Sequence, residues 1–321
     1  YKFIIRTKPT HLHVQGKYFL PAAIIAAKIV GIPVVVTVRD YIILCPHAYC
    51  ITKERNYRSC TLQEAITLDF PQTLKIRSIR NRWHKFFLLL ATLWGWLVSK
   101  LLTFFLKQAS VTVAISKKLA QIYSANNIPI HQVIYNTAHF YKHPPESNRK
   151  KNIILFIGRL TWGKGVDVLI SSYARLGKNQ TLPPLVVVGE GPLKATLKDK
   201  YPEVKFLGRK KHNVIVSLLR VASLVVVPSV WEEPFGRVAL EALVNGTPVV
   251  SSNRGALPEI VSHKVTGMIS TPTPKYLAES IKEALKTELK LRQGIRVQYS
   301  KLRQKFEQIP VRQYENIYQN I

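Results

Sequence analysis

Short apolar, β-branched runs alternate along the chain with segments in which apolar residues recur every three to four positions. The runs predict strands over residues 11–14, 33–38, 111–115, 132–135, 153–157, 185–188, 204–207, 224–227 and 248–251. The periodic segments predict helices over residues 17–30, 117–126, 166–176, 193–200 and 214–221. Runs such as 185–188 and 224–227 are apolar on both faces, as in parallel strands covered by helices. The alternation predicts doubly wound α/β layers.

The chain has 321 residues, which fits two domains at about 150 residues each. Residues 142–151 form a polar, proline-containing segment and are the best candidate for a linker. We therefore expect a first domain over residues 1–148 and a second domain over residues 149–321 that ends in helices.

Residues 86–106 form an almost unbroken apolar run, and the preceding residues 75–85 carry five basic side chains and no acidic one. This pattern fits a helix in a membrane interface, a buried helix beside a solvated basic segment, or a membrane-spanning helix. The predicted strands on both sides belong to one α/β domain, which argues against a span. We expect peripheral contact with an anionic membrane through residues 75–106.

Lysine and arginine number 47 against 18 acidic residues, so the formal net charge is +29, and both halves contribute to it. The 47% hydrophobic content excludes a disordered basic tail, because such a chain buries a substantial core. A basic surface attracts nucleic acid, anionic lipid or anionic substrates such as nucleoside diphosphates. No known nucleic-acid-binding motif accompanies the charge, so we expect no specific nucleic-acid partner; a basic nucleic-acid-binding protein is the less favoured alternative.

The three cysteines, Cys45, Cys50 and Cys60, are too few for a disulfide scaffold and indicate a reducing compartment. Together with His47 they offer a zinc set, but they lack paired C-x-x-C spacing. Buried or inert thiols are therefore the favoured interpretation. The sequence contains neither G-x-S-x-G nor H-E-x-x-H, which leaves hydrolase chemistry without support.

The sharpest motif follows the eighth predicted strand and reads Glu-Pro-Phe-Gly from Glu233 to Gly236, with Glu241 eight positions after Glu233. Pro234 is typical of the first turn of a helix and Gly246 of its end, so we expect Glu233 at the helix N-terminus. Free backbone N–H groups there, at the carboxyl end of a parallel strand, form an anion site. Alternatively, Glu233 only complements the helix dipole and Glu241 is a solvated surface residue.

A second motif follows the predicted strand 153–157 and consists of a glycine-flanked loop before a helix. Its Arg159 and Lys164 are placed to bind phosphates at the strand end, although a solvated basic loop is the alternative. It is not a Walker loop, because no Ser or Thr follows Gly-Lys. After the next strand, the Gly-Glu-Gly-Pro segment containing Glu190 predicts a tight turn that brings backbone near a ligand.

Taken in this order, the motifs resemble those of the retaining nucleotide-sugar glycosyltransferases of family four, the glycosyl transferases group 1. The resemblance covers nearly the whole chain and is strongest over residues 153–260, where the segments 206–209 and 252–259 also match. It implies the GT-B fold, which is α/β with two Rossmann-like doubly wound domains facing a cleft. It also implies a metal-independent, retaining hexosyltransferase-like enzyme with no cofactor beyond its co-substrate, a nucleoside diphosphate sugar.

The resemblance assigns catalytic roles to Glu233, Arg159 and Lys164. It implies that Arg159 and Lys164 bind the donor diphosphate, that Glu241 binds the ribose and that Glu233 contacts the donor sugar. Further donor-site members that it implies are Phe235 and Gly236 through their backbone and, as weaker candidates, Glu190 and Arg209.

The first half resembles the acceptor domain of the same family. Residues 9–13 resemble a strand that ends in a histidine, which makes His13 an acceptor-side candidate. Arg39 stands where many members carry a histidine, so Arg39 and Asp40 are the other acceptor-side candidates. The expected acceptor is a glycan or a lipid-linked acceptor hydroxyl in cell-envelope or polysaccharide biosynthesis, reached in the cytoplasm or at the inner face of the plasma membrane.

Family members begin with a strand and a glycine-rich loop that contacts the donor phosphates from the acceptor side. Nothing resembling this loop occurs here, and the chain begins with Tyr1 rather than methionine. We therefore expect a first domain that is incomplete at its start, and a catalytically inactive glycosyltransferase fragment is the main alternative to an active enzyme.

Overall fold

The computed structural model describes residues 6–45, 57–77, 81–145, 152–177 and 182–321. The chain divides into two compact units, one of residues 1–135 with 311–321 and one of residues 136–310. This division differs from the single boundary expected near residue 149, because the end of the chain packs with the first unit. Residues 146–151 of the expected linker lie outside the described residues.

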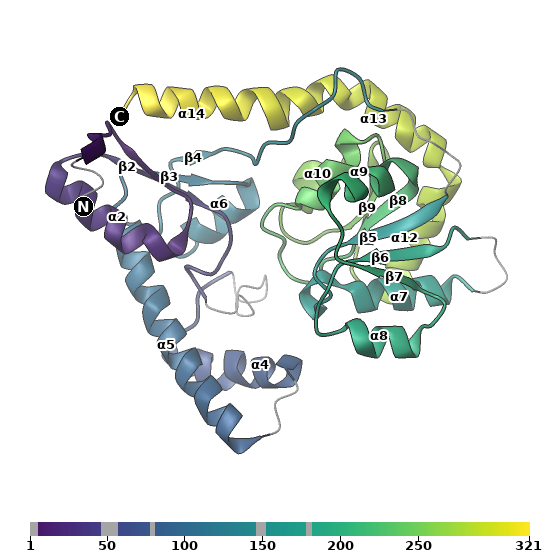
Figure 1. Ribbon diagram of the computed structural model, residues 1–321, viewed down its shortest axis with the longest axis horizontal. Coiled ribbons are helices and arrows are strands. Elements are labelled where there is room, and N and C mark those ends of the chain that lie inside the picture. Colours follow the sequence, from purple (N-terminus) through teal and green to yellow (C-terminus); the bar gives the residue numbers. More distant parts are fainter. Residues whose placement is uncertain (1–5, 46–56, 78–80, 146–151, 178–181) are drawn as a thin grey trace. The chain divides into compact units, whose positions relative to one another are not determined.

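The first unit contains a four-stranded parallel sheet in the order β1-β2-β3-β4 (Figure 1). The strands are β1 (Leu12–Val14), β2 (Val34–Val38), β3 (Val111–Ala114) and β4 (Gln132–Val133). The helices are η1 (Lys17–Phe19), α2 (Leu20–Val30), α3 (Leu62–Glu64), η3 (Ala65–Asp69), α4 (Phe70–Arg77), α5 (Arg82–Leu106), α6 (Lys117–Ser124) and most of α14 (Ile309–Gln319). Ile317 of α14 packs into a core with Val35, Val113 and Ile134 of the sheet region. This apolar contact explains why the end of the chain belongs to the first unit.

The second unit contains a six-stranded parallel sheet with helices on both faces (Figure 1). Its strands are β5 (Ile153–Ile157), β6 (Leu185–Val188), β7 (Lys205–Gly208), β8 (Ala222–Val227), β9 (Val249–Ser252) and β10 (Gly267–Ser270). Its helices are η4 (Trp162–Lys164), α7 (Val166–Arg175), α8 (Lys194–Lys200), α9 (His212–Val221), α10 (Arg237–Val244), α11 (Leu257–Ile260), α12 (Pro274–Lys286), α13 (Glu288–Arg303) and η5 (Gln304–Gln308).

The strand order of this sheet, β10-β9-β8-β5-β6-β7, reverses direction between β5 and β8. Ligands of doubly wound sheets bind outside the carboxyl ends of the strands at such a switch point. The runs predicted as two-sided strands, 185–188 and 224–227, are almost entirely buried. The prediction of parallel α/β layers in both halves is confirmed, whereas β10 was missed because the run from Gly267 to Ser270 is short and half polar.

The long apolar segment forms α5, a helix of 25 residues. By length and composition it is the one helix in the described ranges that is able to cross a membrane, with a mean hydropathy of 1.7 in a window that is only 22% buried. A fully buried helix is therefore excluded for α5. β2 precedes the segment and β3 follows it, and the two strands pair directly in one sheet.

Cys60 is disulfide-bonded, and Cys45 is buried. The prediction that the cysteines are thiols is therefore wrong for Cys60, because a single bridge requires only two thiols that the local fold brings together. Cys50 and His47 lie outside the described residues, so the zinc alternative that includes them is not addressed by the structure. Within the described ranges, no group of three or more His, Cys, Asp or Glu side chains is arranged to hold a metal ion.

Candidate functional site

Lys164 and Glu233 meet at the switch point of the second unit. Lys164 lies in η4, directly after β5, and Glu233 lies in the loop after β8, the neighbouring strand. The Lys164 Nζ donates hydrogen bonds to Glu233 Oε1 at 2.9 Å and to Oε2 at 2.8 Å. The side chains are 24% and 10% exposed, respectively. Lys164, the candidate for phosphate binding, and Glu233, the candidate for sugar binding, are thus in direct contact with each other at the edge of the sheet where this class of fold binds ligands.

Two further donors hold the Glu233 carboxylate in place. Ser229 Oγ and Trp231 Nε1 donate to Glu233 Oε2 at 2.8 Å and 3.1 Å. The Lys164 ammonium also lies over the Trp231 ring, 5.1 Å from its centroid. Charge-assisted hydrogen bonds of this kind stabilise an ionised carboxylate in a buried setting. The Glu233 carboxylate is therefore held in a fixed position, with the Lys164 ammonium in contact with both of its oxygens.

Close backbone contacts hold the loops of the site together. A Cβ on Gly165, whose φ is +67°, would lie 2.0 Å from the Pro228 carbonyl oxygen. A Cβ on Gly255, at φ +61°, would lie 2.1 Å from the Glu233 carbonyl oxygen. These two positions accept only glycine, because any side chain would push the loops after β5, β8 and β9 apart.

The helix after Glu233 begins later than the sequence predicts. α10 starts at Arg237, with Gly236 at φ +98° as its N-cap, so the prediction of Pro234 in the first turn is wrong. A Cβ on Gly236 would meet Leu257 Cδ2 at 2.6 Å, which together with the left-handed conformation explains why glycine occupies this position. Phe235 is buried and packs edge-on against Phe306. The predicted helix end is confirmed, since Gly246 follows the C-cap with a φ of +74°.

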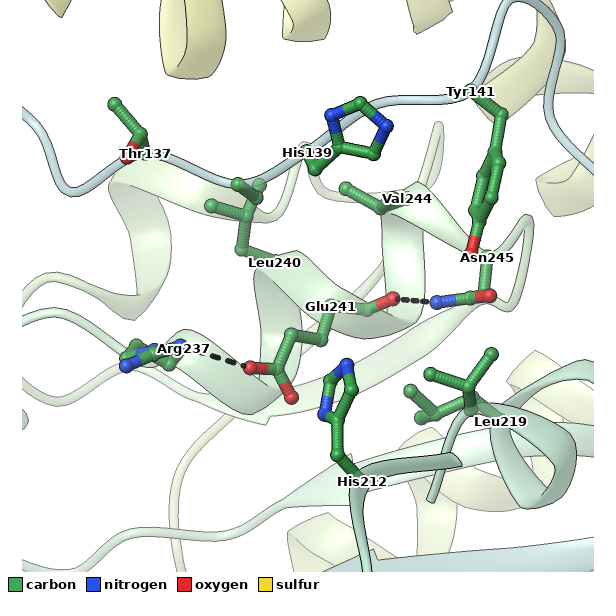
Figure 2. Close-up of a pocket in the computed structure, with 12 residues that line it drawn as sticks. Thr137, His139, Tyr141, His212, Leu219, Arg237, Leu240, Glu241, Val244 and Asn245 are labelled. Carbon is green, nitrogen blue, oxygen red and sulfur yellow. Dashed lines mark hydrogen bonds and ion pairs between the residues drawn. The ribbon is translucent and has the colours of Figure 1, made fainter. Parts of the chain in front are cut away.

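Glu241, in α10, lines a cavity of about 260 Å³ within the second unit (Figure 2). Its Oε1 lies 3.5 Å from Arg237 Nη2, and its side chain is 25% exposed. His212, Asn245 and Tyr141 line the same cavity. Of the two alternatives for Glu241, the structure therefore supports a cavity-lining acid over a solvated surface residue.

The remaining donor-side candidates, Arg159, Glu190 and Arg209, lie on the loops after β5, β6 and β7 and are exposed. Glu190 pairs with Lys194 at 2.7 Å. The three loops share one edge of the sheet, where the Gly189 N–H donates to the Gly208 carbonyl at 3.0 Å. In the described part of the chain, none of the three candidates contacts Glu233.

The acceptor-side candidates lie in two different settings in the first unit: His13 is held by hydrogen bonds, whereas Arg39 and Asp40 line a cavity. Both ring nitrogens of His13 are engaged: Nδ1 with Tyr318 Oη at 2.6 Å, and Nε2 with Thr37 Oγ1 at 2.8 Å. Burial lowers the pKa of His13, and the nearby His11 lowers it further. Arg39 and Asp40 instead line a cavity of about 260 Å³ at the carboxyl ends of β1 and β2.

Sequence reasoning missed several residues that build the donor-side site. Ser229 and Trp231 hold Glu233, and Glu232 Oε2 accepts a hydrogen bond from the Gly255 N–H at 2.7 Å. Arg254 Nη1 lies 3.6 Å from Glu232 Oε1. No local pattern marks these residues, because they lie in the irregular loops after β8 and β9.

Residues 139–301 match the family described as Glycosyl transferases group 1, and the chain belongs to that family. It is 38% identical over 142 residues to an uncharacterized glycosyltransferase, MJ1607, of Methanocaldococcus jannaschii, covering 42% of this chain and 36% of that protein. It is also 38% identical over 125 residues to a glycogen synthase of Mycobacterium tuberculosis, covering 37% of this chain and 30% of that protein. The chain thus matches about a third of the length of these curated relatives.

Solved structures resemble the whole chain. HepE of Anabaena, crystallised in complex with UDP and glucose, has a TM-score of 0.70 at 19% identity and covers 100% of this chain and 81% of its own. Sucrose-phosphate synthase of Thermosynechococcus elongatus has a TM-score of 0.73 at 18% identity, over 99% of this chain and 75% of its own. The predicted GT-B class of fold is confirmed by these likenesses.

Proposed function

We propose that this chain is a retaining glycosyltransferase that moves a sugar from a nucleoside diphosphate sugar to the hydroxyl of a glycan or lipid-linked acceptor in cell-envelope or polysaccharide biosynthesis. The observation that carries the proposal is the contact of Lys164 with Glu233 at the switch point of a group 1 domain. The complex of HepE with UDP and glucose supports a nucleotide-sugar donor.

The donor diphosphate binds at the mouth of α10, beside Lys164 and Arg159. Lys164 keeps a fixed position because Glu233 holds it from the protein side. Two cations and the free N–H groups of a helix N-terminus stabilise the negative charge that grows on a departing diphosphate. This electrostatic stabilisation supplies the role that a metal ion plays in other phosphate chemistry, so the proposed route is metal-independent.

The transfer proceeds on one face of the sugar. The bond between the anomeric carbon and the diphosphate oxygen breaks while the acceptor oxygen bonds to the same carbon. The acceptor hydroxyl gives its proton to an oxygen of the leaving diphosphate, so the anomeric configuration is retained. Glu233 orients the donor sugar and does not bond to it covalently. The hydrogen bonds from Lys164, Ser229 and Trp231 hold its carboxylate in place and lower its nucleophilicity.

The nucleoside of the donor occupies the cavity lined by Glu241. A carboxylate with one long contact to Arg237 retains free acceptor capacity for the two ribose hydroxyls. Tyr141 and His212 line the same cavity and offer aromatic surface to the base.

We also propose that the protein acts in the cytoplasm, in peripheral contact with an anionic membrane through residues 75–106. The apolar surface that α5 exposes supports this placement, together with Arg82 and Lys85 in its first turn, Lys100 nearer its other end and Lys107 just after it. No acidic residue occurs from 81 to 107. Basic flanks and an aromatic-rich apolar face are typical of helices that lie in a membrane interface.

The donor assignment is tested by titration calorimetry with UDP, GDP and ADP on the wild-type protein and on Lys164→Ala. We expect at least one nucleoside diphosphate to bind, and Lys164→Ala to weaken it by about 10- to 100-fold, the loss of one charge-assisted hydrogen bond. Lys198→Ala, which removes an exposed cation from α8 in the same unit, is the matched control and should bind as the wild type does. Equal affinities of the wild type and Lys164→Ala would exclude the proposed donor site.

A further inference from the structure

The cavity of the first unit, which we call the head-group cavity, combines charge with an apolar lining. It lies at the carboxyl ends of β1 and β2, neighbouring parallel strands, where open α/β sheets bind ligands. Lys17 and Arg39 supply its positive charge, and Leu20, Ile42 and Ile43 are among its apolar residues. A polar sugar alone would not require such an apolar lining.

The two cations of the head-group cavity have no carboxylate partner in the part of the chain that the structure describes. Arg39 Nη1 contacts only the neutral Gln15 Oε1, at 3.3 Å, and Lys17 Nζ lies over the ring of Tyr18. The carboxylate of Asp40, which lines the same cavity, accepts a hydrogen bond from the Ile42 N–H at 2.9 Å and thereby holds the turn after β2. The cavity is thus a net positive site with unused guanidinium donors, as phosphate recognition requires.

An exposed apolar surface begins at the rim of this cavity. Tyr18 lines the cavity and is 83% exposed, and the next residue, Phe19, is 75% exposed. They lead directly into α2, on which Ile25 and Ile29 are exposed one turn apart. α2 in turn packs against α5.

α5 carries the largest part of this apolar surface. Seven of its large apolar side chains follow alternating spacings of four and three residues, so they form one stripe along the helix. The stripe consists of Trp83, Phe87, Leu90, Trp94, Leu97, Leu101 and Phe104, each 46–72% exposed. The buried face carries Leu88, Leu102 and Leu106 together with Thr92 and Ser99. A helix that exposes a continuous apolar stripe with two tryptophans opposite its buried face is suited to an apolar environment outside the protein.

A bilayer surface fits this stripe better than a crossing of the membrane. A single crossing would put β2 and β3 on opposite sides, whereas the two strands pair with each other in one sheet. α5 therefore lies along the interface, and the absence of acidic residues from 81 to 107 favours an anionic surface. The head-group cavity and the apolar surface then bind the polar and the apolar part of the same lipid surface.

We infer that the acceptor is a phosphate-bearing membrane lipid with a net negative head group, which enters the head-group cavity with its phosphate on Arg39 and Lys17 while the protein rests on the bilayer through α5 and the Tyr18–Phe19 rim. This inference rests on the proposed function and names the acceptor class for it. Arg39 is then a specificity residue for the anionic head group. Tyr18 and Phe19 form the passage between the cavity and the lipid chains.

The test is sedimentation with phosphatidylcholine vesicles, with and without phosphatidic acid, using the full chain. We expect the wild type to bind both, and more tightly to vesicles that contain phosphatidic acid. The double variant Lys17→Gln/Arg39→Gln should lose about 25-fold in affinity for those vesicles, from about fivefold for each basic residue at an anionic surface. Its binding to phosphatidylcholine alone should stay unchanged, because the choline cation neutralises the phosphate of that lipid. The single variant Arg39→Lys, which keeps the charge, should retain most of the preference.

The matched control is Lys282→Gln/Lys286→Gln, which removes two exposed cations from α12 in the second unit and should keep the preference for phosphatidic acid. An equal loss in the control, or an unchanged preference in Lys17→Gln/Arg39→Gln, would overturn the inference. Binding of soluble glycerol 3-phosphate as tight as that of the vesicles would overturn the assignment to a lipid. Calorimetry with nucleoside diphosphates on the same variants separates the two proposals, because the donor site lies in the other unit and should bind normally.

Discussion

Lys164 contacts both carboxylate oxygens of Glu233 although 69 positions separate the two residues in the sequence. The contact exists because β5 and β8 are neighbours in the sheet and their following loops share one edge. It places a cation that suits a diphosphate beside an acid that suits sugar hydroxyls. The contribution of this pair to the free energy of unfolding of the second unit is measurable without any ligand.

Lys164→Ala should lower the free energy of unfolding of the second unit by about 2 kcal/mol, because it leaves the buried Glu233 carboxylate without its cation. Lys194→Ala is the matched control, since it breaks an exposed pair with Glu190 and should cost about 0.5 kcal/mol or less. Native-state hydrogen exchange of amides in β5 and β8 measures both values. Equal, small losses would mean that the Lys164–Glu233 pair is not effectively buried.

Variants of Glu241 and of Lys164 should respond differently when the ligand is shortened. Glu241→Ala should weaken the nucleoside diphosphate and its free nucleoside alike, by about tenfold, because Glu241 is placed to accept hydrogen bonds from the ribose. Lys164→Ala should weaken only the diphosphate. Calorimetry with both ligands on both variants gives the comparison, and a loss of nucleoside binding in Lys164→Ala would contradict the separate roles.

The stability of the first unit should fall as the pH falls below 6.5, the ordinary pKa of histidine. His13 has a lowered pKa in the folded protein, so the unfolded chain takes up its proton first. The contribution of neutral His13 is therefore complete above pH 6.5 and is lost as the pH falls through the lowered pKa.

Hydrogen exchange of β1 and α14 amides at pH values from about 7.5 to about 5 measures this effect. His13→Gln should reduce the pH dependence, whereas His84→Gln, which replaces an exposed histidine of the same unit, should keep it. An identical pH dependence in the wild type and His13→Gln would show that another group is responsible.

The apolar stripe of α5 should govern binding to vesicles of any head group. Phe87→Ser/Trp94→Ser should weaken binding to phosphatidylcholine vesicles by about tenfold or more for each side chain, from about 1.5–3 kcal/mol for burying a large apolar residue. Leu289→Ser/Val297→Ser removes equally exposed apolar residues from α13 and serves as the control. Sedimentation measures both, and an equal effect of the two double variants would argue against a membrane-facing α5.

Much of the fold follows from local pattern. β5 and β6 end where the sequence predicts, because strands buried on both faces leave a continuous apolar run with sharp ends. The start of α10 was predicted too early, because the chain makes a left-handed turn at Gly236 before the helix begins and no local pattern reveals that turn. The return of α14 to the first unit depends on contacts with β2 and β3, strands that lie about 200 residues or more away in sequence.

The candidate site was predictable as separate groups but not as a constellation. Lys164 and Glu233 each follow a strand, and the family resemblance singled out both. Their contact depends on the strand order, and the hydroxyl of Ser229 and the indole of Trp231 carry no motif of their own. On the acceptor side, His13 lies near the end of β1, as expected. Both of its ring nitrogens, however, are hydrogen-bonded to the hydroxyls of Thr37 and Tyr318, which are distant in the sequence.

The most direct test of the account is a crystal structure of the protein with the nucleoside diphosphate that binds it best in calorimetry. The account predicts a phosphate oxygen within hydrogen-bonding distance of Lys164 Nζ and a ribose hydroxyl on the carboxylate of Glu241. A ligand bound elsewhere, with the contact between Lys164 and Glu233 unchanged and the Glu241 cavity empty, would contradict it.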